Sequence, residues 1–192
     1  MPITTLSSLR THLQWALELE HSTIPPYLCA LYSIPDGSNV AVSALIRSVV
    51  MEEMLHMVLA ANVLNAVGGK PNVSHRKFVP SYPAYLPHSD KAFKVNLLPF
   101  STEAVDTFLK IERPMPPKAR LRSNRYHTIG QFYSAIQEGV ETLERRARAR
   151  GKTIFTGKRS RQVAGDKWYY GGGGAPVTVE SVLNQVRKTV SG

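Results

Sequence analysis

The chain has 192 residues, 43% of them hydrophobic, and its 24 Lys and Arg residues against 14 Asp and Glu residues give a formal net charge of +10 at pH 7. This length and apolar content suit a single domain over residues 1–192. One cysteine, Cys29, excludes a disulfide framework and is interpreted as a small buried hydrophobe. No apolar run has the length of a membrane span or of a leader segment, so we expect a soluble cytoplasmic protein without a membrane partner.

The first predicted element is an amphipathic helix whose apolar face carries one acid. Glu20 interrupts that face, and Pro25 and Pro26 follow one turn later. Each proline lacks an N–H and clashes with the carbonyl four residues back, which predicts a kink beside the acid. The apolar face recurs at spacings of three and four: Leu6, Leu9, Leu13, Ala16, Leu17, Ile24, Leu28 and Leu31.

The second predicted helix runs from Ser38, as N-cap, to Val67 and carries two polar residues on its apolar face. Glu53 and His56 fall at the centre of the face, whereas Glu52 lies to one side and Asn62 away from it. The face is made of residues three and four apart: Val42, Leu45, Ile46, Val49, Val50, Met57, Ala60, Leu64 and Val67.

Acids on two apolar faces point to a metal site. A buried charge without a partner costs several kcal/mol. In helical bundles, a Glu from one helix and a Glu-x-x-His pair from its neighbour are what a carboxylate-bridged metal site takes from each pair of helices. Taken singly, Glu20 or Glu53 would fit a rim residue or a partner of Arg, and His56 would fit a core histidine; the three together favour a metal. Carboxylate and imidazole ligands suit iron or manganese, and zinc as an alternative.

The stretch 72–96 is rich in Pro, Tyr and His and is interpreted as an ordered excursion over the bundle, a candidate cover for the mouth of the site. His75, His88 and His127 have no helical phase to argue from. A short helix is predicted from Ser101, its N-cap, to about Ile111, and prolines between 114 and 117 then break the chain.

The third bundle helix is predicted from Thr128 to about Arg150. Glu138 lies opposite its apolar face, which makes it a solvated residue unless a π-bulge near Gly139 turns it inward, and Glu144 lies nearer the edge. The apolar face comprises Ile129, Phe132, Tyr133, Ile136, Val140 and Leu143.

The last stretch of the chain is the least regular. Residues 171–174 are all Gly and form a flexible turn without the Gly-Lys-Ser/Thr ending of a phosphate loop, so nucleotide binding there is rejected. Val177–Val190 predicts a final short helix, or the first half of a fourth bundle helix.

Two segments, LQWALELEHSTIPPYL (13–28) and EEMLHMVLAANVLNAVGGKP (52–71), resemble the ferritin-like domain of the iminophenyl-pyruvate dimer synthase family, relatives of the bis-indole synthases of the violacein and rebeccamycin pathways. The resemblance implies an all-α, ferritin-like helical bundle with a non-haem iron site, to which Glu20, Glu53 and His56 contribute ligands. It also implies an oxidoreductase of secondary metabolism that couples two imino acids derived from aromatic amino acids. Shorter matches follow in the family's order: Leu98–Ser101, Phe108–Pro114, Thr128–Tyr133 and Tyr169–Gly174.

The chain departs from that family at its end. Relatives continue past the stretch that Val179–Val190 resembles, into a segment with a further Glu and a His, whereas this chain stops at Gly192. The fourth helix is therefore expected to be truncated, in a shortened protein, in a fragment, or in a subunit that shares its site with a second copy. We expect a single metal at Glu20, Glu53 and His56, or an empty half-site, in preference to a metal shared between two copies. We also expect a homo-oligomer that covers the apolar groove left by the missing helix.

The positive charge is concentrated, since 15 of the 24 Lys and Arg residues lie between Lys110 and Lys167. Helix-dipole compensation and a solvated face account for part of it. An Arg-lined mouth would attract a small amino-acid-derived substrate such as an α-imino carboxylate. The alternative function is a metal-free basic binding or scaffold protein for nucleic acid or an acidic protein. No nucleic-acid motif accompanies the charge, which disfavours a nucleic-acid partner.

Overall fold

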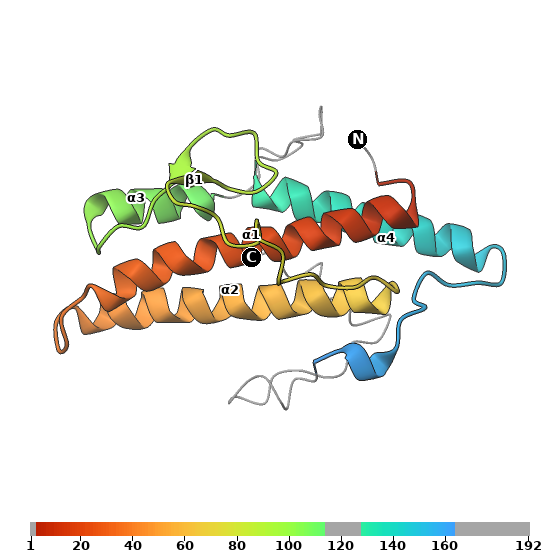
Figure 1. The fold of residues 1–192 in the computed structure, drawn as a ribbon, viewed down its shortest axis with the longest axis horizontal. Helices are drawn as coiled ribbons and strands as arrows, with labels where there is room; N and C mark the ends of the chain where they lie inside the picture. Colours follow the sequence, from red (N-terminus) through yellow and green to blue (C-terminus); the bar gives the residue numbers. More distant parts are fainter. Residues whose placement is uncertain (1–2, 114–127, 164–192) are drawn as a thin grey trace.

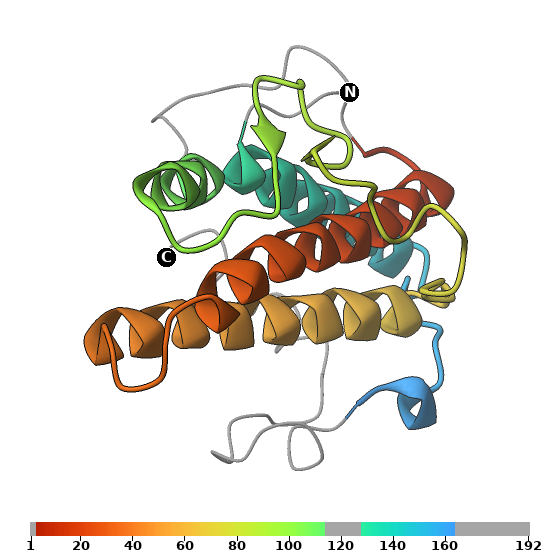
Figure 2. The same cartoon turned by 60° about the vertical axis from the view of Figure 1, so that its left-hand side comes forward.

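The computed structural model describes residues 3–113 and 128–163, which form four α-helices, one short hairpin and a 3₁₀ turn (Figure 1). The central helix lies between the second helix on one side and the third and fourth helices, which follow one another along it, on the other (Figures 1 and 2). This is the all-α bundle that the periodicity predicts. The predicted helix Val177–Val190, the Gly171–Gly174 turn and His127 lie outside the described residues. The elements in chain order are α1 (Leu6–Tyr32), α2 (Val40–Ala66), β1 (Ala84–Tyr85), β2 (Lys94–Val95), α3 (Thr102–Ile111), α4 (Ile129–Arg148) and η1 (Arg159–Arg161).

The helix starts follow side-chain capping in three cases of four. The hydroxyls of Thr5, Ser101 and Thr128 each accept an N–H three residues on, at the starts of α1, α3 and α4. The predicted N-cap of α2, Ser38, is wrong: the cap is Asn39, in the left-handed conformation with φ 46°. The Ser38 hydroxyl donates instead to the Pro35 carbonyl at 2.8 Å, so it stabilises the preceding turn.

Helix α1 continues through both prolines to Tyr32. Pro26 has no N–H for the carbonyl of Ser22, which is the partner four residues back. The Tyr82 hydroxyl donates to that carbonyl at 2.6 Å and satisfies it. The helix therefore tolerates this proline because a side chain from the excursion replaces the missing donor.

The core lies along both flanks of α1. Its larger part joins α1 to the second half of α2, to α4 and to residues of the excursion, with Leu17, Leu64, Ile136 and Val140 almost fully buried. A smaller cluster around Tyr27 joins the last turns of α1 to the first half of α2. Within the described residues, no helix is long and apolar enough to cross a membrane.

The excursion is ordered and packs on α1, as predicted. Its strands pair antiparallel with Ala84 opposite Val95. Three of its polar contacts with α1 fall at Gln14, Glu18 and Ser22, spaced four residues apart and so on one face of the helix. Its rings also contact Trp15 and His21. Glu20 is two residues from Glu18 and Ser22, about 200° around the helix. These three polar contacts thus lie on the face of α1 turned away from Glu20, and the role of the excursion as a cover for the mouth of the site stays a prediction.

Asn62 is buried, with 2% of its surface exposed, although its helical phase predicts a solvated side chain. Its side-chain amide donates to the Val163 carbonyl and its oxygen accepts the Val163 N–H, both at 2.9 Å. The segment after α4 thus returns to the outer face of α2. Gly157 N–H also donates to the Ala66 carbonyl, and Asn65 donates to the Arg161 carbonyl, both again at 2.9 Å.

Candidate metal centre

Three side chains converge between α1 and α2: Glu20, Glu53 and His56. One ligand atom from each lies within 4.8 Å of the others. His56 Nδ1 is 3.5 Å from Glu20 Oε2 and 4.0 Å from Glu53 Oε1. Only 3% of Glu20 and 7% of Glu53 is exposed, while His56 is partly exposed.

The helices supply this arrangement directly. Glu53 and His56 are three residues apart on α2 and so project side by side. Helix α1 runs antiparallel to α2 and packs along it, which brings Glu20 to the same level (Figure 1). The sequence-predicted residues therefore lie together, and their role as metal ligands stays a prediction.

Two hydroxyls hold the carboxylates, and their roles were not predicted. The Tyr133 hydroxyl from α4 donates to Glu20 Oε1. The Thr23 hydroxyl donates to Glu53 Oε2 at 2.5 Å and also lies 2.8 Å from the Glu20 carbonyl oxygen. Thr23 is three residues after Glu20, so helical spacing alone places it near the site. Tyr133 belongs to the predicted apolar face of its helix, and only its hydroxyl indicates that it can also form a hydrogen bond with a buried polar group.

The electrostatics of the cluster favour protonation without a cation. Burial, and then the neighbouring charge of Glu20, raise the pKa of Glu53 to about 9. Burial lowers the pKa of His56, but the hydrogen bond and charge of Glu20 outweigh it and the net shift is upward. Burial and Glu20 also raise the pKa of the Tyr133 hydroxyl well above its usual value.

The donor set fits a metal cation. Two buried carboxylates face one imidazole, and among the described residues no Lys or Arg forms an ion pair with either. A cation would offset both the burial and the repulsion by Glu20 that raise the pKa of Glu53. Oxygen and nitrogen donors without thiolate suit iron or manganese, with zinc as an alternative.

The remaining candidate residues lie elsewhere. Glu52 and Glu138 are exposed, and α4 is assigned as α-helix throughout Ile129–Arg148, so no π-bulge turns Glu138 inward. His75 and His88 contact Glu18, at 3.3 and 2.9 Å, outside the cluster.

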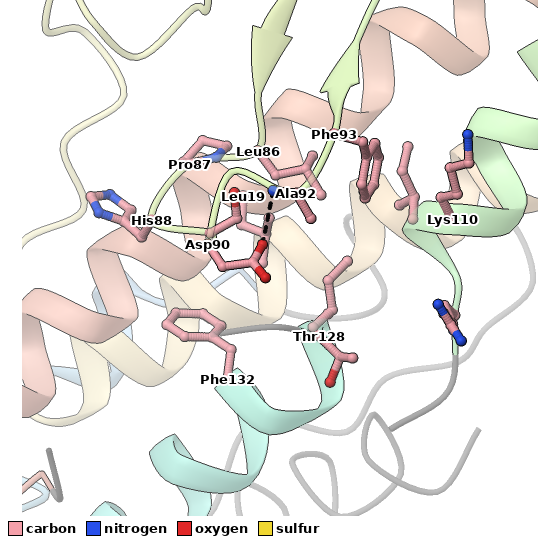
Figure 3. A pocket seen from close by; sticks show the side chains of 14 residues that line it. Leu19, Leu86, Pro87, His88, Asp90, Ala92, Phe93, Lys110, Thr128 and Phe132 are labelled. Atoms are coloured by element: carbon pink, nitrogen blue, oxygen red, sulfur yellow. Dashed lines mark hydrogen bonds between the residues drawn. The ribbon is translucent and has the colours of Figure 1, made fainter. Parts of the chain in front are cut away.

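A cavity of about 370 Å³ lies between the excursion, the end of α3 and the start of α4 (Figure 3). Phe93 and Phe132 stand on different walls of it, with Lys110 at the rim. None of the three cluster residues lines it, although Leu19 and Phe132, which do, directly precede Glu20 and Tyr133 in the chain. The cavity and the cluster are thus separate features served by the same two helices.

Comparison with known proteins identifies the family to which this bundle belongs. A model of the ferritin-like family matches residues 13–191. The chain is similar to a crystal structure of a ferritin like protein from Caulobacter vibrioides, with 29% sequence identity and a TM-score of 0.74, over 100% of this chain and 66% of that one. It thus spans just under two thirds of that protein's length, and no curated protein sequence matches it. The family model covers nearly all of the chain, and the chain belongs to the ferritin-like family.

Proposed function

We propose that the protein is a non-haem iron oxidoreductase in which Glu20, Glu53 and His56 hold the metal. The observation that carries the proposal is the meeting of two buried carboxylates and an imidazole with no cationic side chain paired to either carboxylate among the described residues. Iron, when bound there, supplies one-electron redox chemistry. Tyr133 and Thr23 orient the two carboxylates through their hydroxyls.

The proposed reaction is oxidative coupling of two imino acids derived from aromatic amino acids, which the resemblance in the segments around Glu20 and His56 implies. Forming one carbon–carbon bond between them releases two electrons and two protons, for which dioxygen, reduced to peroxide, is the acceptor. None of the three cluster residues lines the cavity, but its lining suits such a substrate, because Phe93 and Phe132 offer aromatic walls and Lys110 and Arg113 offer positive charge for a carboxylate.

Metal analysis tests the first part of the proposal. Protein purified without added metal, and the same protein after reconstitution with Fe(II), should contain iron. His56→Ala should lose it while retaining its helical content, since Ala is a good helix former. His75→Ala is the matched control, because His75 also contacts a carboxylate but lies outside the cluster. A folded wild type that takes up no iron, manganese or zinc would refute the proposal.

The second part has its own measurement. The iron-loaded protein, given the imino acid that an amino-acid oxidase makes from phenylalanine or tryptophan, should yield a product joining two substrate units, detected by mass spectrometry. If iron is bound and no coupled product forms, the metal assignment stands and the proposed substrate class is wrong.

A further inference from the structure

We propose that an exposed basic band, residues 145–163, binds the phosphate backbone of double-stranded nucleic acid. The band comprises the last turn of α4, the segment that follows it and η1 (Figure 1). It contains eight Lys and Arg residues and no Asp or Glu. This inference goes beyond the proposed function, because it does not depend on a bound metal. All eight cationic residues are exposed: Arg145, Arg146, Arg148, Arg150, Lys152, Lys158, Arg159 and Arg161.

The charges of the basic band are almost unused within the described part of the protein. Of the eight residues, Arg148 alone forms an ion pair there, with Glu144 at 2.8 Å. The C-terminus of α4 carries a dipole charge equivalent to about −0.5 elementary charge. That charge is too small to offset Arg145, Arg146 and Arg150. Compensation of the helix dipole therefore explains only a small part of the band, and most of its positive charge faces solvent.

The backbone of the basic band is fixed against the C-terminal end of α2. The Gly157 N–H donates to the Ala66 carbonyl, and the Asn65 side chain donates to the Arg161 carbonyl, both at 2.9 Å. A Cβ at position 157 would lie 1.7 Å from the Asn65 carbonyl oxygen, so only glycine allows this approach. Both views of the ribbon show the segment passing this end of α2 (Figures 1 and 2). Because these anchors use backbone groups of the band, its cationic side chains are held at fixed points and stay available to a partner.

The composition of the basic band favours nucleic acid over a membrane or a protein partner. Between Arg145 and Gln162 no large hydrophobic side chain is exposed. A helix that binds a membrane surface inserts an apolar face, and a protein interface is built around apolar and aromatic anchors. Interfaces with nucleic acid are more polar and more positively charged. Six of the eight cations are Arg, whose planar guanidinium matches a phosphate with two hydrogen bonds.

The basic band suits a duplex that is contacted through its phosphates. Duplex DNA carries one negative charge about every 1.7 Å along its axis, which is a dense array for fixed cations. Proteins that bind single strands stack the bases on aromatic rings. The aromatic side chain of the band, Phe155, packs against the core instead. The sequence holds no motif that reads bases, so binding should not depend on the base sequence.

The first test measures binding of short fluorescein-labelled DNA duplexes by fluorescence anisotropy, with a chelator present. If about five of the cations contact phosphates, the affinity should fall by about two orders of magnitude or more between 50 and 200 mM KCl. Two duplexes of unrelated sequence should bind alike. Failure to bind either duplex at 50 mM KCl would refute the proposal, while the proposed iron site would be unaffected.

A triple variant tests whether the basic band is the surface that binds. It should lower the affinity at least about tenfold at about 100 mM KCl and reduce the slope of log affinity against log salt by about 3. Gln is close to Arg in helix propensity, so circular dichroism should show unchanged helical content. The variant removes three unpaired cations of the band: Arg146→Gln, Arg150→Gln and Arg159→Gln.

The matched control removes the same charge from exposed positions outside the band: Arg47→Gln, Lys91→Gln and Lys94→Gln. It should change the affinity by less than about threefold, because charges farther than about 10 Å from the phosphates are largely screened by salt. An equal loss of affinity in the two triple variants would mean that net charge, and not the band, binds nucleic acid. That result would overturn the proposal.

Two further probes separate nucleic acid from other anionic partners. Poly-L-glutamate should displace the labelled duplex much less effectively than unlabelled duplex of the same total charge. Vesicles that contain phosphatidylserine should bind the protein more weakly than the duplex does. If poly-L-glutamate competes equally, the band is a surface for acidic proteins, and if the vesicles bind more tightly, it is a surface for membranes. Either result would show that the proposed partner is wrong.

Discussion

At the scale of single residues, Glu53 shows how the metal-free protein accommodates a buried acid. Its carboxyl is buried beside that of Glu20, and its pKa is raised to about 9. At neutral pH it therefore keeps its proton. Thr23 has one hydroxyl proton for two acceptors, so a protonated Glu53 can donate to Thr23 while Thr23 donates to the Glu20 carbonyl. Metal binding must displace the proton of Glu53, so affinity should rise with pH.

The same shift predicts how the stability of the metal-free protein depends on pH. Between about pH 4.5, the usual pKa of Glu, and about pH 9, the folded state binds a proton at Glu53 that the unfolded state has lost. The free energy of unfolding should fall as the pH rises through this window. Glu53→Gln, which is neutral at every pH, should lack this part of the fall.

Urea unfolding of both proteins at pH 5, 7 and 9, with a chelator present, measures it. The difference in stability between Glu53→Gln and wild type should grow in favour of the variant as the pH rises. Glu52→Gln, on the exposed side of the same helix, is the control and should show a constant difference. A constant difference for Glu53→Gln as well would show that Glu53 is not protonated in the folded protein.

At the scale of elements, the C-terminus of α2 is held by a single side chain from far along the sequence. Arg10 on α1 donates from Nε and Nη2 to the Val67 carbonyl, at 2.9 and 2.7 Å, and so closes the C-terminus of α2. A positive charge there also complements the helix dipole. Gly68 follows with φ 71°, and a Cβ at this position would lie 2.9 Å from the Arg10 guanidinium. Glycine therefore allows this close approach.

We predict that Arg10→Ala lowers the free energy of unfolding by about 1.5–3 kcal/mol, the usual contribution of a hydrogen bond to a charged donor. Chemical denaturation measures the change. Arg47→Ala, an exposed position of α2, should change stability by less than about 0.5 kcal/mol. Equal effects of the two substitutions would mean that the contact with Val67 contributes nothing.

Glu144 stabilises the turn after α4 in a similar way, through hydrogen bonds to one side chain. Its carboxylate accepts from Arg148 Nε at 2.8 Å, from the Thr153 hydroxyl, and from the Ile154 N–H at 2.9 Å. Burial tends to raise the pKa of Glu144, but these hydrogen bonds outweigh it, and the pKa is lowered from its usual value. The turn is thus fastened by an ionised carboxylate.

Glu144→Gln should therefore destabilise the protein at neutral pH, by about 1–3 kcal/mol. The loss should shrink as the pH falls below about 4.5, because a lowered pKa stabilises the folded state only above the unfolded value and this stabilisation disappears on protonation. Thermal melting at pH 7 and pH 3.5 checks both statements. Glu138→Gln, exposed on the same helix, should shift neither melting temperature.

At the scale of the whole molecule, the segments outside the helices are anchored on α1 and α2. The Glu18 carboxylate on α1 contacts the side chains of His75 and His88, which come from the two halves of the excursion. The Trp15 ring stacks on His88 with ring centroids 4.1 Å apart. On the opposite side of the bundle, Asn62 pairs with the backbone of Val163. The contacts at Glu18 lie on the side of α1 turned away from Glu20.

We predict that Glu18→Ala loosens the excursion while the helices stay folded. Trypsin should then cut faster at Arg76, Lys77, Lys91 or Lys94, since these exposed bonds are protected only by the anchors of the segment. Mass spectrometry of a digestion time course identifies the sites. Glu103→Ala on α3 should leave the pattern unchanged. Unchanged cleavage in Glu18→Ala would mean that packing of Phe78, Leu86 and Val95 holds the excursion without Glu18.

Periodicity by itself determined the four helices, the cluster and the surface position of Glu138. Glu20, Glu53 and His56 break apolar faces at a period of 3.6, and a helix repeats that period whatever its partners, so their convergence is predictable from two helices alone. The hydroxyl of Ser101 likewise acts on an N–H only three residues away. Local backbone geometry decides such features, so they can be predicted from the sequence alone.

Only the tertiary structure decided which residues from distant parts of the sequence contact these helix faces. Asn62 is buried by a segment about 100 residues later, Tyr133 reaches Glu20 across 113 positions, and Glu112 reaches Tyr27 across 85. The partner of a polar side chain is chosen by the packing of whole helices, which no local period encodes. The polar anchors of the excursion lie on the far face of α1 for the same reason: Glu18 and Ser22 bind it through two histidines and a tyrosine that carry no helical phase.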